Sequence, residues 1–290
     1  MTMYVFWSLV NKVIHKKYFT LRKTVEKLYS REYSQNFPLD SFRLNYLASM
    51  DCGFCGSLGS LKSYGRYKSS DSNEGISLHI CDKCFCIYDG SSEINRRDLK
   101  SIQTEWVREG VLYNLPAESE ITMVIEKHGD LYIDLSRIIN RKLAGAMLEV
   151  GAGDGLRAAA ALRFFDHVDV YDVANEKIVK LINYINNPAY HIINHTDIAD
   201  RMYDTILMWH TLEHLCRPYE CIKYLANTLN KNGLLIIQVP LFSFDHLDPS
   251  HLWFPCDSSF QVVASTAGLK VLWLGYDYQA LFLTCVLERV

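Results

Sequence analysis

The chain has 290 residues, enough for one large domain or two smaller ones, and 49% of them are hydrophobic, enough for a sizeable core. Thirty Lys and Arg residues against 33 Asp and Glu residues give a net charge of −3. This charge provides no general electrostatic attraction to nucleic acid, so we do not expect DNA as a partner. No apolar run approaches the roughly 20 residues that a transmembrane helix requires.

Residues 1–48 have the apolar spacing of helices, with Leu21, Val25 and Leu28 on one face. The apolar run at the start is short, positive charges follow it rather than precede it, and no small-residue cleavage site is present. These features argue against a signal peptide. We predict an N-terminal helical segment over 1–48 that packs on the rest of the protein. The alternative is a basic amphipathic helix that makes weak contact with a membrane surface.

Five of the nine cysteines lie between Cys52 and Cys86, in a stretch rich in Gly and Ser. Two C-x-x-C pairs of this kind are typical of a tetrahedral structural zinc site. We therefore predict a zinc ribbon over 49–90 with the ligands Cys52, Cys55, Cys81 and Cys84. Cys86 is predicted to be either a buried thiol or a competing zinc ligand. The alternative to a zinc site is that the clustered cysteines are buried free thiols. A metal cluster together with scattered thiols indicates a reducing compartment, the cytoplasm.

Within this region the segment 63–75, rich in Ser and other polar residues, is predicted to be an exposed loop. After the ribbon, residues 91–140 are predicted to form a helical linker or lid.

From residue 144 onward, apolar strands alternate with helices. The predicted strands cover 146–150, 168–173, 189–194, 203–209 and 234–240. The helix after the fourth strand is predicted over 217–230, with Asn232-Gly233 as its stop signal, and a further helix is predicted near 257–267. Apolar strands separated by helices predict a parallel sheet that is covered on both faces. Two further strands, 270–278 and 280–289, are joined by a connection too short for parallel neighbours, so they must form an antiparallel hairpin. The predicted fold is α/β, with a Rossmann-like, mostly parallel sheet of seven strands.

The first of these strands runs into a glycine-rich turn, LEVGAGDG at 148–155. Glycine allows backbone to approach a ligand where a strand meets a helix. The spacing does not fit a dinucleotide fingerprint, whose third glycine would stand at Leu156, and the Lys of a P-loop is missing. Glu149 and Asp154 would repel a pyrophosphate but suit a cationic, amino-bearing ligand.

With these residues, 144–290 resembles the class I S-adenosylmethionine-dependent methyltransferases, among them the methyltransferase-23 type and the quinone and sugar methyltransferases. The resemblance rests on the glycine turn, on an acid that ends the second strand, on a D-x-x-x…L-E-H…P segment at the fourth strand, and on the terminal hairpin. It implies a methyltransferase domain over 141–290. It also implies cofactor contacts from Glu149, Gly151, Gly153, Gly155, Asp172, Val173, Asp197, Ile198 and Trp209.

In the family, the residue at Asp172 accepts the ribose hydroxyls, while Asp197 and Ile198 lie at the adenine. A helix N-cap is the alternative for Asp172, and a cap of a short turn is the alternative for Asp197.

Catalytic candidates lie at the ends of the fourth and fifth strands, where open sheets of this kind bind ligands. They are His210, Glu213, His214 and His251. Related quinone O-methyltransferases carry E-x-x-E-H at the first three and are associated with a divalent metal, but His210 replaces the first acid here. A base, a His/Glu/His metal site and an anchored loop all stay open. His251, like His246, lies in a segment similar to the family's H-L-x-x-F-(T)-P loop on the substrate side.

The resemblance implies an enzyme that transfers a methyl group from S-adenosylmethionine to an O or C atom of a small molecule or glycan. A sugar or polysaccharide precursor is favoured, because similar zinc ribbons precede the domain in some sugar C-methyltransferases. The alternative is an RNA or protein methyltransferase that uses the ribbon to bind its substrate. A non-catalytic cofactor-binding module is the third reading. The zinc is expected to be structural, since four thiolates leave no open coordination position.

Overall fold

The computed structural model describes residues 51–68, 75–89, 115–215, 217–243, 246, 251–277 and 279–290. The predicted helices over 1–48, with their membrane-surface alternative, and the part of the predicted linker over 91–114 lie outside these residues. None of the helices within these ranges is long and apolar enough to cross a bilayer.

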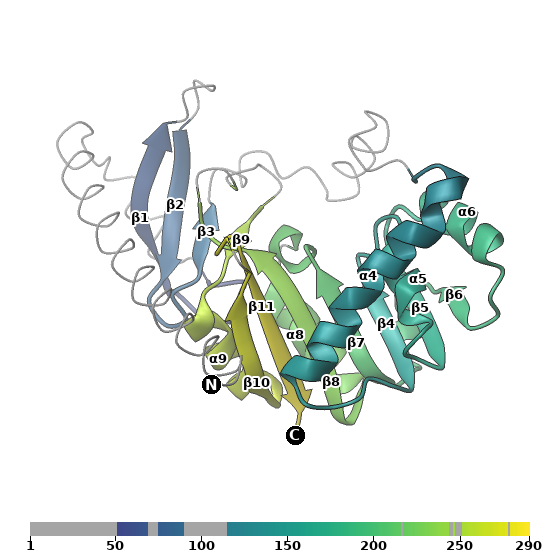
Figure 1. The fold of residues 1–290 in the computed structure, drawn as a ribbon. Coiled ribbons are helices and arrows are strands. Elements are labelled where there is room, and N and C mark those ends of the chain that lie inside the picture. Colours follow the sequence, from purple (N-terminus) through teal and green to yellow (C-terminus); the bar gives the residue numbers. More distant parts are fainter. Residues whose placement is uncertain are drawn as a thin grey trace, which may run out of the picture.

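The larger sheet has seven strands in the order β10-β11-β8-β7-β4-β5-β6 (Figure 1). Five neighbouring strands are parallel: β4 (Ala146–Val150), β5 (His167–Tyr171), β6 (Tyr190–Ile192), β7 (Tyr203–Trp209) and β8 (Leu229–Pro240). The last two, β10 (Leu269–Tyr276) and β11 (Phe282–Arg289), form an antiparallel hairpin, and β11 pairs antiparallel with β8. The predicted α/β fold with a mostly parallel seven-stranded sheet and a terminal hairpin is confirmed.

Helices cover both faces of this sheet, which explains why its strands are apolar throughout. The helices are α4 (Glu118–Ile138), α5 (Leu156–Ala161), α6 (Glu176–Ile185), α7 (His195–Ile198), the 3₁₀ turn η2 (Leu212–His214), α8 (Pro218–Asn227) and α9 (Asp257–Ala267). Successive residues of β4 belong to separate cores: Met147 packs with α4, α5 and α6, whereas Leu148 packs with α8 and α9. Strand alternation thus divides one apolar run between two cores.

A smaller antiparallel sheet contains the cysteines. Its order is β1-β2-β3-β9, with the bounds Leu61–Lys68, Gly75–Cys81, Ile87–Asp89 and Trp253–Phe254. The strands β1 to β3 follow one another in the chain, but β9 comes from the connection between β8 and α9. Figure 1 shows this sheet beside the hairpin end of the larger one. The connection between β8 and α9 therefore supplies one strand of the smaller sheet.

Three local predictions were wrong. Residues 63–68 belong to β1 and pair with β2, rather than forming a loop. The helix predicted over 217–230 ends at Asn227. Asn232-Gly233, taken as its stop signal, lies inside β8 instead. The register of β8 against β7 shifts between Tyr203 and Thr205, so extra β8 residues bulge out, and Asn232 takes a positive φ of 61° there.

The helix α4 falls at the end of the predicted linker and packs against α5. The Tyr132 ring lies 5.4 Å from that of Phe164, and its hydroxyl donates a hydrogen bond to the Arg157 carbonyl at 3.0 Å.

Candidate active site

The glycine turn follows β4 at the carboxyl edge of the sheet, and all three of its glycines have positive φ angles. At Gly151, with φ of 74°, an added Cβ would lie 2.3 Å from Oγ1 of Thr211, so the fold itself excludes a side chain there. At Gly153, with φ of 60°, an added Cβ would meet no atom of the described residues within 4 Å. Packing therefore does not explain a glycine at position 153; its left-handed φ favours one, and the open space leaves room for a ligand against the backbone.

Asp172 directly follows β5 and faces this turn. Its Oδ2 accepts a hydrogen bond from the Gly153 amide at 2.8 Å, and its Oδ1 accepts one from the Ala174 amide at 2.9 Å. Burial raises the pKa of this carboxyl above its usual value, although the backbone hydrogen bonds oppose the rise. The side chain is half-buried, while Val173 beside it is 42% exposed. A carboxylate is thus fixed in position at the rim of the turn.

Glu149, by contrast, lies beneath the turn with none of its surface exposed. Its Oε1 accepts a hydrogen bond from Arg157 at 2.9 Å. Burial raises the pKa of Glu149 to about 7, and the Arg157 guanidinium partly offsets this effect. The same guanidinium lies 5.3 Å from the centre of the Trp209 ring, at the end of β7. The structure therefore places Glu149 in an internal ion pair that supports the turn and the half-buried Trp209.

Two residues of this region were missed from the sequence. Arg157 joins Glu149 to Trp209, and Thr211 donates a hydrogen bond from Oγ1 to the Val150 carbonyl at 3.2 Å. The only sequence signal for either was its position after a glycine turn or a strand end. Each of them contacts a residue of another element, and local periodicity does not show which elements lie side by side.

The two residues predicted at the adenine lie in α7. Asp197 forms a capping box with Asn194, whose amide donates to Asp197 Oδ2 at 3.2 Å, and this bond lowers the pKa of Asp197. Ile198 is buried in the core beside β7 and β8. The local role considered for Asp197, that of a cap, is thus present in the structure.

Two of the four catalytic candidates, His210 and His214, flank a third, the buried carboxylate of Glu213. Glu213 is 1% exposed, and neither of its carboxylate oxygens accepts a hydrogen bond from the described part of the chain. Its Oε1 lies 3.6 Å from His210 Nδ1 and 3.9 Å from His214 Nε2. His210 has a positive φ of 54°, and its ring packs edge-on against Phe282 at 4.6 Å. Glu213 thus lies between two imidazoles, each with a ring nitrogen within 4 Å of its Oε1.

The fourth candidate, His251, reaches the same cluster from the segment before β9. Its ring centre lies 4.9 Å from that of His214, and its Nδ1 donates a hydrogen bond to the His246 carbonyl at 2.8 Å. One ligand atom from each of Glu213, His214 and His251 lies within 4.8 Å of the other two. This trio could hold a proton or a metal ion, and it contains His251 in place of the His210 considered from the sequence.

The four predicted zinc ligands are buried and lie together. Their sulfur atoms are all within 4.8 Å of one another, and two pairs, Cys52–Cys84 and Cys55–Cys81, are 3.7 Å apart. A tetrahedral zinc with Zn–S bonds of about 2.3 Å separates its sulfur ligands by about 3.8 Å. Backbone amides of Lys83 and Cys84 approach the Cys81 sulfur at 3.4 Å. Cys86 lies outside this group, and its thiol donates to the Ile87 carbonyl at 3.6 Å.

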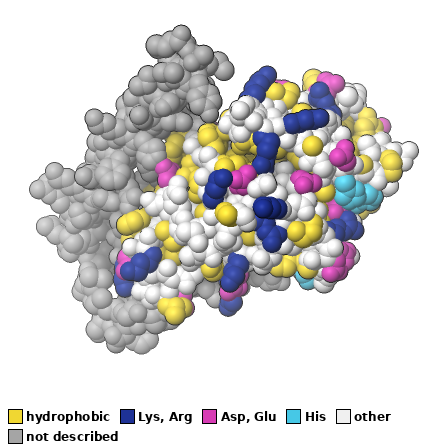
Figure 2. Space-filling model, turned by 90° about the horizontal axis from the view of Figure 1, so that it is seen from below, with side chains coloured by type: hydrophobic (Ala, Val, Ile, Leu, Met, Phe, Trp, Pro, Cys, Tyr) yellow, Lys and Arg dark blue, Asp and Glu magenta, His cyan; other side chains and the backbone are white. Residues whose placement is uncertain are grey.

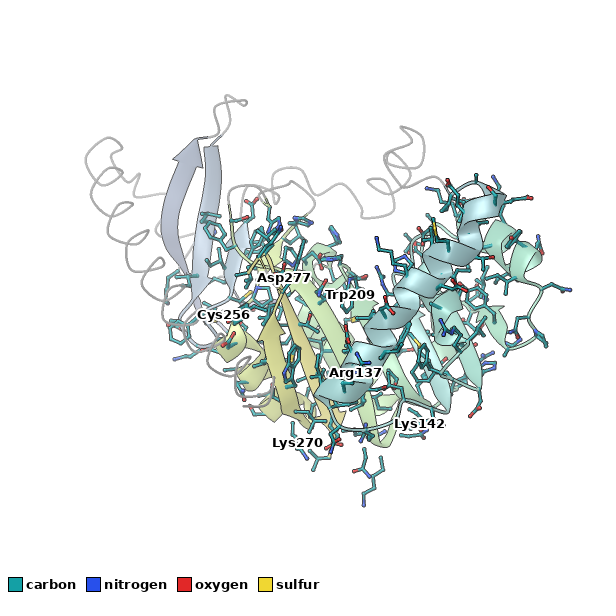
Figure 3. All side chains as sticks on the ribbon, viewed as in Figure 1. Arg137, Lys142, Trp209, Cys256, Lys270 and Asp277 are labelled. Carbon is teal, nitrogen blue, oxygen red and sulfur yellow. The ribbon has the colours of Figure 1, made fainter. Side chains whose placement is uncertain are left out.

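A cavity of about 310 Å³ opens at the opposite, amino edge of the sheet. Its lining includes Arg141, Lys142, Asp204 and Lys231. Figure 2 views the molecule from below, the side of the amino edge in Figure 1, and shows Lys and Arg side chains scattered over it with Asp and Glu among them. In Figure 3, Lys142 lies at this edge and Trp209 toward the other. Because sheets of this type bind ligands at the carboxyl ends of their strands, the cavity is separate from the candidate site.

The strand order, the glycine turn after the first parallel strand and the acid after the second give the chain a Rossmann-like architecture whose ligand site lies at the carboxyl edge of the sheet. A family model described as a methyltransferase domain matches residues 127–279, and the chain belongs to this family. No protein among the curated sequences matches it.

Solved structures with a similar fold include three methyltransferases. Magnesium protoporphyrin IX methyltransferase from Synechocystis PCC 6803, solved with bound SAH, shares 14% identity over 68% of this chain and 99% of its own, with a TM-score of 0.49. An S-adenosylmethionine-dependent methyltransferase from Clostridium acetobutylicum shares 12% over 57% and 91%, with a TM-score of 0.44. An amino pentose methyltransferase from Micromonospora echinaspora shares 9% over 58% and 92%, also with a TM-score of 0.44.

Proposed function

We propose that the chain binds S-adenosylmethionine at the glycine turn and transfers its methyl group to an O or C atom of a small hydroxyl-bearing molecule or glycan, such as a sugar or polysaccharide precursor. One observation carries the cofactor half of this proposal: the Asp172 carboxylate is fixed 2.8 Å from the amide of Gly153. There the chain leaves room for a ligand against its backbone.

The residues present fit this cofactor. The Asp172 carboxylate accepts backbone hydrogen bonds on both oxygens, and because a carboxylate offers about four acceptor positions, it can still accept a ribose hydroxyl. Asp154 adds negative charge within the turn, which suits a cationic sulfonium ligand and disfavours a phosphate. S-adenosylmethionine supplies an activated methyl group whose leaving group needs no protein acid. The chain's task is therefore to align the acceptor and to exclude water.

On the acceptor side, we assign proton handling to His214, with Glu213 and His251 beside it. An acceptor hydroxyl or acidic carbon must lose a proton as the new bond forms, and a positioned imidazole can take that proton. The buried carboxylate of Glu213, 3.9 Å from His214 Nε2, would stabilise the imidazolium that results. His210, on the other side of Glu213, is the second candidate for this role. Polar groups of this kind suit a hydroxylated acceptor.

We further propose that Cys52, Cys55, Cys81 and Cys84 hold a structural zinc ion. The 3.7 Å spacing of the paired sulfurs supports this assignment, because it matches the edge of a Zn–S₄ tetrahedron. A reducing compartment such as the cytoplasm would keep the thiols available for zinc.

Calorimetric titration with S-adenosylmethionine tests the cofactor half. Asp172→Asn should weaken binding by about tenfold or more, which corresponds to about 1.4 kcal/mol. Asp166→Asn removes an exposed carboxylate near the opposite edge and is the matched control, with unchanged affinity expected. A wild-type protein that does not bind S-adenosylmethionine would refute the proposal.

The acceptor half is tested with methyl-labelled S-adenosylmethionine and a fractionated cell extract. Label in the small-molecule or glycan fraction supports the proposed acceptor class. Label confined to RNA or protein contradicts that class while leaving the cofactor assignment intact.

A further inference from the structure

We infer that the cysteine module, defined as residues 51–68 and 75–89 with their four clustered thiols, positions the acceptor side of the active site. It does so through β9, the strand that follows His251. The inference rests on the proposed function and assigns the module a role within the site, rather than that of a separate substrate-binding domain.

The first step is the pairing of β9 with the module. Strand β9 has two residues and joins the edge of β3 in the register Ile87–Phe254 and Tyr88–Trp253. The Asp89 amide also donates a hydrogen bond to the Leu252 carbonyl at 3.0 Å. A strand this short is not stable by itself, so its position depends on the sheet that it joins.

The second step links β9 to the catalytic cluster, which consists of Glu213, His214 and His251. The Leu252 amide donates to the Glu213 carbonyl at 2.8 Å, and Trp253 Nε1 donates to the Leu215 carbonyl at 2.9 Å. The Trp253 ring, 3% exposed, lies 4.4 Å from the Tyr88 ring of the module. Trp253 is therefore held between the module and the turn that carries Glu213 and His214. His251, two residues before it, is fixed by the same contacts.

The third step is the attachment of the cysteine turns themselves. The Tyr219 amide at the start of α8 donates to the Gly53 carbonyl at 3.0 Å. At the start of α9, Ser259 Oγ donates to the Cys84 carbonyl at 2.8 Å. Figure 3 labels Cys256 where α9 meets the module. A metal that fixes the four thiolates would therefore fix the module against both helices, and with it β3 and β9.

The cofactor side depends on different contacts. The Gly151 amide donates to the Tyr171 carbonyl at 2.8 Å, and the Gly153 amide donates to Asp172. These bonds join β4 to β5, at the other side of β7 from the module. Loosening the module should consequently disturb acceptor handling and leave the affinity for S-adenosylmethionine nearly unchanged.

The test compares two conservative variants. Trp253→Phe keeps an aromatic ring but removes the bond to the Leu215 carbonyl, whereas Trp273→Phe makes the same change in β10, remote from the cluster. We expect Trp253→Phe to speed amide hydrogen exchange over 251–255 by about tenfold and to slow methyl transfer into the labelled extract fraction by a similar factor. Zinc content and S-adenosylmethionine affinity should stay at wild-type values in both variants.

A second arm removes the metal with a chelator under reducing conditions. Faster exchange over 251–255, with unchanged exchange over 146–156, supports the inference. Unchanged exchange over 251–255 in both arms overturns it, as does a loss of S-adenosylmethionine affinity equal to the loss of transfer. If metal removal unfolds the chain, the Trp253→Phe comparison decides. Exchange is measured without cofactor, so a failure of the proposed function, seen as absent S-adenosylmethionine binding by the wild type, is distinguishable from a failure of this inference.

Discussion

Alanine substitutions at Gly153 and Gly268 separate backbone strain from ligand contact. Both glycines have a left-handed conformation, with φ of 60° and 71°, and within the described part of the chain an added Cβ at either would meet nothing within 4 Å. Each alanine should therefore cost only the left-handed strain, about 1 kcal/mol. In a domain of this size that cost lowers the unfolding midpoint by roughly 2 to 4 °C. The two variants should therefore be equally stable, but they lie at different positions relative to the proposed cofactor site.

Gly153 bonds to Asp172 at the proposed cofactor site, whereas Gly268 ends α9. A methyl group at 153 would occupy the space in which S-adenosylmethionine approaches the backbone. We expect Gly153→Ala to weaken its binding by about tenfold or more, or about 1.4 kcal/mol, and Gly268→Ala to leave binding unchanged. Calorimetric titration gives the affinities, and thermal unfolding checks that the variants are equally stable. Wild-type affinity in Gly153→Ala, or equal losses in both variants, would refute the reasoning.

Three further predictions concern buried charges and the catalytic cluster. Burial raises the pKa of Glu149 from 4.5 to about 7. Between these two pH values the folded chain holds a proton that the unfolded chain has released. The free energy of unfolding therefore falls by up to about 3 kcal/mol as the pH rises from 4.5 to 7. Glu149→Gln should flatten the fall in unfolding midpoint between pH 5 and pH 8, and an unchanged slope would contradict this account. The buried carboxylate of Asp169 accepts hydrogen bonds from three side chains, those of His167, Arg201 and Tyr203. Asp169→Asn should lower the free energy of unfolding in urea by about 2 to 3 kcal/mol, after allowance for the half-exposed partners, whereas the exposed control Asp166→Asn should leave it unchanged. His214→Gln should reduce methyl transfer by about 100-fold with unaltered S-adenosylmethionine affinity, and a parallel loss of affinity would show that His214 serves the cofactor side instead.

Much of the larger sheet could be predicted because its strands are apolar, short and separated by strong helix formers. The range 203–209 matches β7, and 257–267 matches α9. Errors arose where one local signal has two structural uses. Asn232-Gly233 reads as a helix stop but forms a bulge in β8, because the neighbouring strand β7 sets the register there. Likewise, the polar segment 63–68 is a strand because β2 pairs with it.

The sequence by itself determined the glycine turn, the acid that follows the second parallel strand and the spacing of the two cysteine pairs. These features depend on residues close together in the chain or on a repeating strand–helix order, which periodicity and spacing report directly. Only the tertiary structure decided that Glu149 is buried against Arg157, that His251 meets Glu213 and His214, and that β9 completes the sheet of the cysteine module. Such contacts join segments whose separation along the chain reaches more than 160 residues in the case of β3 and β9, and the packing of the whole chain, rather than any local pattern, brings them together.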